Sequence, residues 1–183
     1  MMLFFRKNNF LLLFSILYSL FSVLSGCAVI GPYVSDEEIQ AASDELRVKA
    51  LKFQIDYLNK VNNIGYKLLL GLPEEERKGN FIFSGLLLAS TDRYLAKLYQ
   101  LPTDRAVAVI GLVEDSPAKK SGILIGDLIK SVDGLSVYAL SDVAYVFNHK
   151  APNQQVALSV VRKGLPLNFT FRLGSKPIDV AFR

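Results

Sequence analysis

Cysteine and histidine are almost missing from this 183-residue chain, which has one of each. A single cysteine excludes an intrachain disulfide framework and any zinc site built from several cysteines. A single histidine excludes the motifs that need two imidazoles. The sequence has no glycine-rich phosphate loop and no basic segment with interleaved aromatic residues, so nucleotide and nucleic-acid binding have no support. We therefore expect no metal or other cofactor and no nucleic-acid partner.

Charge is equally uninformative about partners. The chain has 21 basic and 17 acidic residues, and its net charge of +4 forms no strongly basic stripe. The hydrophobic fraction is 51% and the mean hydropathy is +0.29, which is too apolar for a disordered chain. The length fits one domain, or one domain with a helical appendage.

The first 26 residues have the pattern of an export signal. Two basic residues, Arg6 and Lys7, precede an apolar run at 10–24 that only three serines interrupt. This run has 15 residues, whereas a helix needs about 20 to cross a bilayer core, so a retained transmembrane anchor is the weaker interpretation. We predict a signal peptide at 1–26.

The end of this segment, Leu24-Ser25-Gly26-Cys27, resembles the lipobox of bacterial lipoproteins. The resemblance implies lipidation of the Cys27 sulfur, cleavage before Cys27 and acylation of the new amine. Several acyl chains, each contributing about 0.8 kcal/mol per buried methylene, would anchor the protein to a membrane. Ala28 then favours the outer membrane in a Gram-negative host. The alternatives are an uncleaved signal anchor and an unmodified cysteine.

A long amphipathic helix is predicted at 36–71, after a tether at 27–35. Ser35 and Glu38 have capping-box spacing, and Gly71 followed by Pro73 is a stop signal. Apolar residues recur at steps of three and four: Ile39, Ala42, Leu46, Ala50, Phe53, Tyr57, Val61, Ile64 and Leu68. This stripe could be a coiled-coil seam, a docking face for a partner or the surface that packs on the next domain. The irregular spacing favours packing on the next domain. A charged connector is expected at 72–79.

From residue 80 the pattern changes to that of a small mixed α/β (α+β) domain. Strand-like runs occur at 81–89, 106–113, 127–132, 155–162 and 165–172, with helical patterns near 92–99 and 140–149. Ser116 and Pro117 are suited to start a one-turn helix, and Asp133-Gly134 is suited to a tight turn. We expect this domain to span 80–174, followed by a C-terminal tail at 175–183.

The order of these elements resembles the PDZ domain of bacterial HtrA-type proteases. The shared features are Ser116-Pro117-Ala118, Gly122-Ile123, Gly126-Asp127, a helix, and a final hairpin around Arg162-Lys163-Gly164. The resemblance implies a partly open barrel of five to six strands with two short helices. It also implies that an extended peptide, usually a protein C-terminus, adds a strand to an exposed sheet edge.

The family's carboxylate-binding loop corresponds here to Phe83-Ser84-Gly85-Leu86. A glycine at position 85 would let backbone amides approach a terminal carboxylate closely. Ser84 stands where the family usually has an aliphatic residue. This substitution could select a different terminal side chain or mark a vestigial groove.

The walls of the groove follow from the same resemblance. Leu86 and Leu88 would lie on one face of the edge strand because side chains alternate along a strand. The helix at 140–149 should supply Ala144 and Phe147 from the other side. That helix lacks the histidine with which some PDZ domains select Ser or Thr, so an apolar ligand terminus is expected.

Residues 45–69 and 96–101 resemble the N-terminal half of PDZ-bearing bacterial zinc metallopeptidases. Their His-Glu-x-x-His motif is absent, and His149 alone cannot form a zinc site. No Gly-x-Ser-x-Gly elbow surrounds any serine, so Ser116, Asp142 and His149 do not indicate a catalytic triad. We expect no enzymatic activity.

Three functional hypotheses follow. The first is a lipid-anchored, non-catalytic adaptor or sensor that binds peptide or protein C-termini on the periplasmic face of the cell envelope, with an envelope protease as a possible partner. The second is the regulatory part of a zinc metallopeptidase whose catalytic part lies on another chain. In the third, the helix at 36–70 covers the peptide groove and the protein is an assembly subunit.

Overall fold

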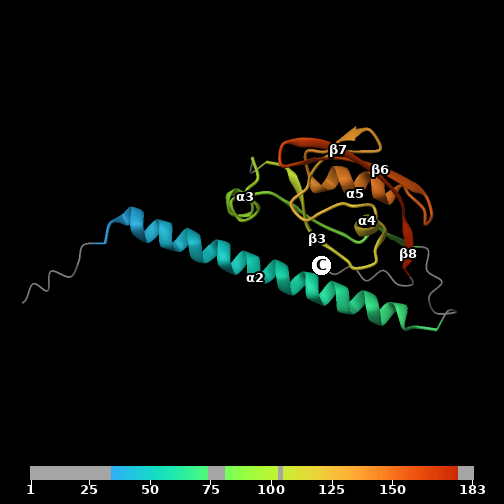
Figure 1. Ribbon diagram of the computed structural model, residues 1–183, viewed down its shortest axis with the longest axis horizontal. Helices are drawn as coiled ribbons and strands as arrows, with labels where there is room; N and C mark the ends of the chain where they lie inside the picture. The colour runs from blue at the N-terminus through green and yellow to red at the C-terminus, as the bar shows by residue number, and fades with distance from the viewer. Residues whose placement is uncertain (1–33, 74–80, 103–104, 177–183) are drawn as a thin grey trace, which may run out of the picture. The chain divides into compact units, whose positions relative to one another are not determined.

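The computed structural model describes residues 34–73, 81–102 and 105–176 (Figure 1). The predicted signal peptide and Cys27 lie outside these residues, as do most of the predicted connector and the last seven residues of the predicted tail. Of the helices in the described ranges, none is both long enough and apolar enough to cross a membrane.

The predicted long N-terminal helix is α2, which runs from Asp36 to Leu70 and has no break at Asn62 and Asn63. The predicted capping box is present at its start: the Ser35 amide donates to the Glu38 carboxylate at 3.0 Å, and the Glu38 amide donates to the Ser35 hydroxyl at 3.2 Å. At its end the Gly71 amide donates to the carbonyls of Lys67 and Leu68. Local sequence therefore sets both ends of α2.

The described residues of the domain that follows form eight strands, all paired antiparallel. The strands are β1 (Phe81–Phe83), β2 (Leu86–Ser90), β3 (Val107–Leu112), β4 (Leu128–Val132), β5 (Leu135–Ser136), β6 (Gln155–Arg162), β7 (Leu165–Arg172) and β8 (Gly174–Lys176). Six form one sheet in the order β2-β3-β4-β6-β7, with β5 paired to β4, and β1 pairs with β8. This is the α+β fold that the sequence predicts.

Two details differ from the predicted strands. The run at 81–89 is divided into β1 and β2, because Gly85 adopts a left-handed conformation (φ +80°) that a continuous strand does not allow. The segment expected to begin the C-terminal tail instead includes β8, whose Lys176 is opposite Phe81 of β1.

Three short helices accompany the sheet: α3 (Arg93–Tyr99), α4 (Pro117–Lys120) and α5 (Leu140–Asn148). Ser116 caps α4, accepting from the Lys119 amide at 3.3 Å, and Pro117 occupies the first turn, both as predicted. Asp133 and Gly134 both have positive φ in the turn between β4 and β5, which also agrees with the sequence.

The sheet has an apolar cluster on each face. Alternation separates the two clusters: Val107 and Val109 of β3 belong to the one that includes Val143 and Val146 of α5, whereas Ala108 belongs to the other. The second cluster joins Ala108 and Leu128 to Leu95 of α3 and Ile55 of α2. Helices α5 and α2 therefore pack on opposite sides of β3 (Figure 1).

The face of α2 that packs on the domain is not the stripe that the periodicity favours. Ile55 is 4% exposed and Leu51 is partly buried, whereas Phe53 and Tyr57 of the stripe are 75% and 60% exposed. The expectation that the stripe packs on the following domain is wrong. The packed face includes Asn59 and Asn63, and polar residues such as these are typical of a solvent-exposed helix face.

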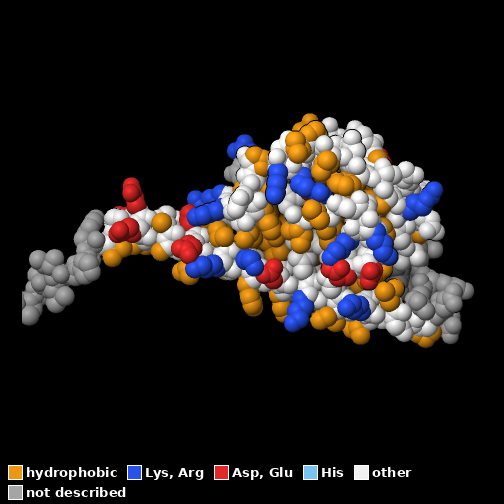
Figure 2. Space-filling view, viewed as in Figure 1, with side chains coloured by type: hydrophobic (Ala, Val, Ile, Leu, Met, Phe, Trp, Pro, Cys, Tyr) orange, Lys and Arg blue, Asp and Glu red, His pale blue; other side chains and the backbone are white. Residues whose placement is uncertain are grey.

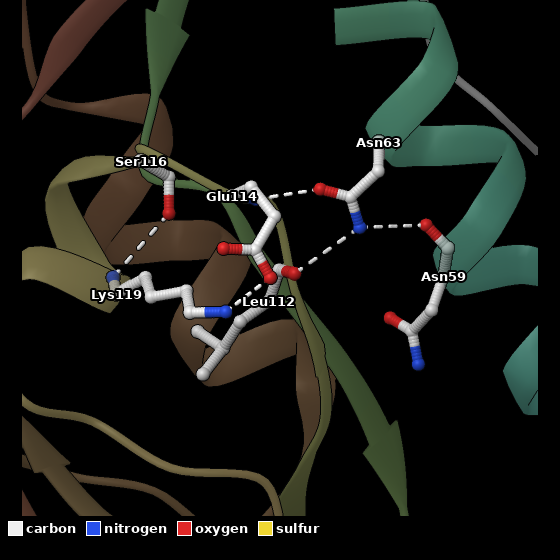
Figure 3. A network of polar contacts seen from close by, with 6 residues as sticks. All are labelled: Asn59, Asn63, Leu112, Glu114, Ser116 and Lys119. Atoms are coloured by element: carbon white, nitrogen blue, oxygen red, sulfur yellow. Dashed lines mark hydrogen bonds and ion pairs between the residues drawn. The ribbon is translucent and has the colours of Figure 1, made fainter.

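These asparagines attach α2 to β3 and to the loop after it (Figure 3). The Asn59 amide donates to the Ile110 carbonyl at 3.0 Å, and the Asn63 oxygen accepts from the Glu114 amide at 2.6 Å. Asn59 lies directly over Gly111, where an added Cβ would be 1.7 Å from the Asn59 side-chain oxygen. Gly111 is therefore needed for the close approach of α2.

Candidate functional site

The loop between β1 and β2 has a conformation that requires glycine at position 85. Gly85 is buried with φ +80°, and a Cβ built on it would lie 2.0 Å from the Ser116 Cβ. The Ser84 carbonyl accepts from the Ala118 amide at 3.0 Å, and the Gly85 carbonyl accepts from the Val113 amide at 2.9 Å. The loop is thus fixed by the segment that leads into α4.

This arrangement determines where two amide groups of the loop point. In a trans peptide unit the N–H points opposite to the C=O. The Ser84 carbonyl shares its unit with the Gly85 amide, and the Gly85 carbonyl shares its unit with the Leu86 amide. Because both carbonyls face α4 and the loop before it, both amides point away from that segment. Two adjacent backbone donors of this kind can bind an anion such as a carboxylate.

The Ser84 hydroxyl occupies one of these donors. It accepts a hydrogen bond from the Leu86 amide at 3.2 Å. The usual aliphatic residue at this position could not accept such a bond. The Leu86 amide therefore already has an acceptor within the chain.

Strand β2 stands at the end of its sheet. It pairs with β3 along one edge, and no described strand pairs with its other edge. Helix α5 lies beside β2. Leu86 and Leu88 of β2 and Phe147 of α5 are all partly buried against the same apolar cluster, and Ala144 of α5 is exposed. The structure thus brings the predicted residues of both walls to an edge strand and its neighbouring helix.

Helix α2 contacts the carboxylate-loop side of this site at one point. The rings of Tyr66 and Phe83 are stacked, with centroids 4.5 Å apart and an interplanar angle of 14°. Burial raises the pKa of the Tyr66 hydroxyl, and the nearby Asp115 carboxylate raises it further. Local sequence gives no signal for this contact, because Tyr66 and Phe83 are distant in sequence and only tertiary packing brings them together.

The three residues that could compose a catalytic triad instead have separate structural contacts. Ser116 is fully buried as the cap of α4, and the His149 Nδ1 atom lies 2.7 Å from the Tyr145 carbonyl oxygen. Asp142 accepts the amides of Tyr138 and Ala139, and these two hydrogen bonds lower the pKa of its carboxyl group. The described ranges also hold no cluster of three or more side chains suited to a metal ion.

A buried ion pair lies away from the groove and was also missed. The Asp127 carboxylate is fully buried and accepts from Arg162 Nε at 2.7 Å and from a second guanidinium nitrogen at 2.8 Å. The hydrogen bond to Asp127 raises the pKa of Arg162, although burial opposes it. The sequence signal for this ion pair was a charged residue, Asp127, next to the buried strand β4. Its position in a predicted turn suggested only local hydrogen bonding.

Comparison with known proteins agrees with this geometry. Residues 85–173 match the family model of the PDZ domain. The chain is 28% identical over 95 residues to a probable periplasmic serine endoprotease, DegP-like, of Hahella chejuensis, and 27% identical over 95 residues to one of Pseudomonas fulva. In both cases the match covers 52% of this chain and 20% of the relative.

A solved structure has the same fold. The HtrA-type protease AlgW with a decapeptide is 24% identical to this chain, with a TM-score of 0.51, and the match covers 54% of this chain and 30% of that one. Residues 85–173 are thus similar to a PDZ domain, with homology to the PDZ domains of HtrA/DegP-type proteases. The chain spans about a fifth of the length of the DegP-like relatives, and the similarity falls on the non-catalytic PDZ part.

Proposed function

We propose that this protein is a lipid-anchored, non-catalytic PDZ protein of the cell envelope that binds peptide or protein C-termini as an adaptor or sensor. The observation that carries the proposal is the paired orientation of the Gly85 and Leu86 amides at the beginning of edge strand β2. A terminal carboxylate would accept from these two amides, and the preceding residues of the ligand would pair with β2.

The side-chain environment favours an apolar terminal residue. Leu86, Leu88 and Phe147 offer partly buried apolar surface next to the loop. An apolar terminal side chain packed there would gain about 25 cal/mol per Å² of buried area. The AlgW structure was obtained with a decapeptide, which supports peptide binding by a domain of this fold.

The proposed location depends on the lipobox and on the relatives. The DegP-like relatives are described as periplasmic, which supports a place in the envelope. We propose lipidation at Cys27, with the outer membrane favoured in a Gram-negative host through Ala28. Growth in labelled palmitate should label the native chain and not the Cys27→Ser variant, and an unlabelled native chain would contradict the anchor.

Peptide binding is tested with fluorescent peptides of envelope-protein C-termini that end in Val, Leu or Phe. Amidation of the terminal carboxylate should weaken binding at least about tenfold, because charge-assisted hydrogen bonds contribute about 1.5–3 kcal/mol. Equal binding of free and amidated peptides would exclude carboxylate capture by the loop.

A matched pair of variants tests whether the peptide lies between β2 and α5. Ala144→Asp puts a negative charge on the proposed wall and should weaken binding. Tyr145→Asp is the control, because Tyr145 is also exposed but lies about 100° further round α5. Equal effects of the two substitutions would place the ligand elsewhere.

The second hypothesis, a regulatory part whose zinc metallopeptidase lies on another chain, stays a prediction. A neighbouring reading frame with a His-Glu-x-x-His motif would support it, and co-purification would test it. The third hypothesis is not supported, because α2 packs on β3, β4 and α3 on the face of the sheet opposite α5.

A further inference from the structure

Helix α2 carries an exposed apolar stripe on the side that faces away from the domain. Figure 2 shows hydrophobic side chains protruding along that edge of the helix. Five large members of the stripe between Leu46 and Leu68 are each at least half exposed: Leu46 66%, Phe53 75%, Tyr57 60%, Ile64 50% and Leu68 70%. With Ala42 and Ala50, which are also exposed, the stripe spans about 39 Å of helix.

The geometry of the helix separates this stripe from the packed face. Its members follow steps of three and four residues, so all of them lie within one sector of the helix surface. Ile55 lies about 180° away from Leu46 at 100° per residue, and Ile55 is the most buried residue of α2. The domain therefore cannot cover the stripe while α2 keeps its observed contacts.

The charges along one border of the stripe are arranged symmetrically. Glu45, Lys49, Asp56 and Lys60 lie on the same flank in the order acidic, basic, acidic, basic, and Lys67 follows them on that flank. If this order is reversed end to end about a point between residues 52 and 53, Glu45 falls opposite Lys60 and Lys49 falls opposite Asp56. Each position thus meets the opposite charge in a reversed copy of the same helix.

We propose that the stripe binds a second copy of this chain, with the two α2 helices antiparallel. In an antiparallel pair, equivalent flanks face each other, so the four charges would form Glu45–Lys60 and Lys49–Asp56 pairs between copies. Within about one residue of this register, Leu46 packs beside Tyr57 and Ala50 packs beside Phe53 of the second copy. The two domains would be on the outside of the helix pair.

The flanking charges disfavour a parallel pair. A parallel arrangement brings each flank against the opposite flank of the partner. The opposite flank of the stripe carries Arg47 and Gln54, which offer a single charge to Glu45, Lys49, Asp56 and Lys60 on the first flank. The existing pairs Glu45–Lys49 and Lys52–Asp56 within α2 are exposed, and such pairs contribute little, so they do not prevent new pairing.

Cysteine crosslinking of the full chain in intact cells tests the register. The Lys49→Cys and Asp56→Cys pair in one chain should give a disulfide-linked dimer on a non-reducing gel. Each single variant should run as an uncrosslinked chain on the same gel. The two copies of position 49 would be about 10 Å apart along the helix axis, which is beyond the reach of a disulfide. The parent chain, which keeps Cys27, gives the background.

Ile64→Cys distinguishes the two orientations. In the antiparallel register the two copies of position 64 are about 35 Å apart, whereas a parallel seam places them together. A dimer from Ile64→Cys would overturn the antiparallel proposal. The absence of a dimer from the Lys49→Cys and Asp56→Cys pair would overturn self-association.

Charge exchange gives a test without cysteines. In sedimentation of the detergent-solubilised full chain, Glu45→Lys should weaken the dimer several-fold, and Glu45→Lys with Lys60→Glu should restore it. Unchanged sedimentation of both variants would overturn the pairing. If the chain is instead monomeric and Cys27→Ser binds phosphatidylglycerol vesicles in a manner that Phe53→Asp abolishes, the stripe faces a membrane and the proposal fails.

Discussion

The hydroxyl of Ser84 accepts a hydrogen bond from the amide of Leu86 at 3.2 Å, within the loop proposed to bind a terminal carboxylate. A ligand carboxylate would have to replace this hydroxyl. Ser84 therefore reduces the net gain from one of the two loop amides, although the amide stays directed toward the site.

Removing the hydroxyl should strengthen peptide binding. With Ser84→Val the Leu86 amide has no internal acceptor, and we expect affinity for a carboxylate-terminated peptide to increase about two- to tenfold, equivalent to one hydrogen bond of about 0.5–1.5 kcal/mol. Ser84→Thr keeps the hydroxyl and is the control. Titration of a fluorescent peptide gives the dissociation constants, and weaker binding by Ser84→Val would show that the hydroxyl contacts the ligand.

The stacking of Tyr66 on Phe83 should make the loop sensitive to α2. Tyr66→Ala leaves Phe83 without its stacked partner, an interaction of about 0.5–1.5 kcal/mol, and should weaken peptide binding a few-fold by loosening the loop. Tyr66→Phe keeps the ring and should bind like the native chain. Should Tyr66→Ala bind normally while remaining folded, the loop is ordered by α4 alone.

Gly111 should be replaceable only when Asn59 is shortened. Gly111→Ala places a Cβ 1.7 Å from the Asn59 oxygen, so α2 must shift, and amide exchange around Ile55 should accelerate. Adding Asn59→Ala removes the clash and loses one hydrogen bond, worth about 1 kcal/mol. Amide exchange around Ile55 should therefore be slower in the double variant than in Gly111→Ala. Faster exchange in the double variant would contradict this account of the contact.

The buried ion pair should be a principal determinant of stability. Asp127→Asn removes the charge that Arg162 binds, and we expect a loss of about 2–4 kcal/mol in the free energy of unfolding, because Arg162 keeps partial access to water. Asp56→Asn, at an exposed pair, should change stability by less than about 1 kcal/mol. Urea unfolding of both variants provides the comparison.

Asp133 should contribute a pH-dependent part of stability. Burial alone would raise its pKa, but the Ala157 amide and the Lys150 ammonium lower the pKa below its usual 3.8. Because the folded-state pKa is depressed, the contribution is complete above the unfolded-state pKa and is lost as pH falls through the folded value. Asp133→Asn should flatten the decline of the urea midpoint below about pH 4. If the urea midpoint of the variant declined as in the native chain, other carboxylates would be responsible for the loss of stability at low pH.

Local sequence was sufficient for most secondary-structure elements. The ends of α2 follow from Ser35, Glu38 and Gly71, and the start of α4 follows from Ser116 and Pro117, because capping depends on residues within one helical turn. Strand alternation and turn residues likewise predicted β3, β4, β6 and β7 closely. The position of Gly85 indicated the loop, and its positive φ agrees with that indication.

Tertiary structure alone decided which face of α2 is buried. The apolar periodicity favoured the stripe of Phe53 and Tyr57, yet the domain packs on Ile55 and on Asn59. An isolated sequence cannot show that an asparagine will meet backbone groups of β3 over a glycine 52 residues away. The pairs Tyr66–Phe83 and Asp127–Arg162 have the same origin, because stacking and ion pairing between residues distant in sequence depend on distances that only the folded chain sets.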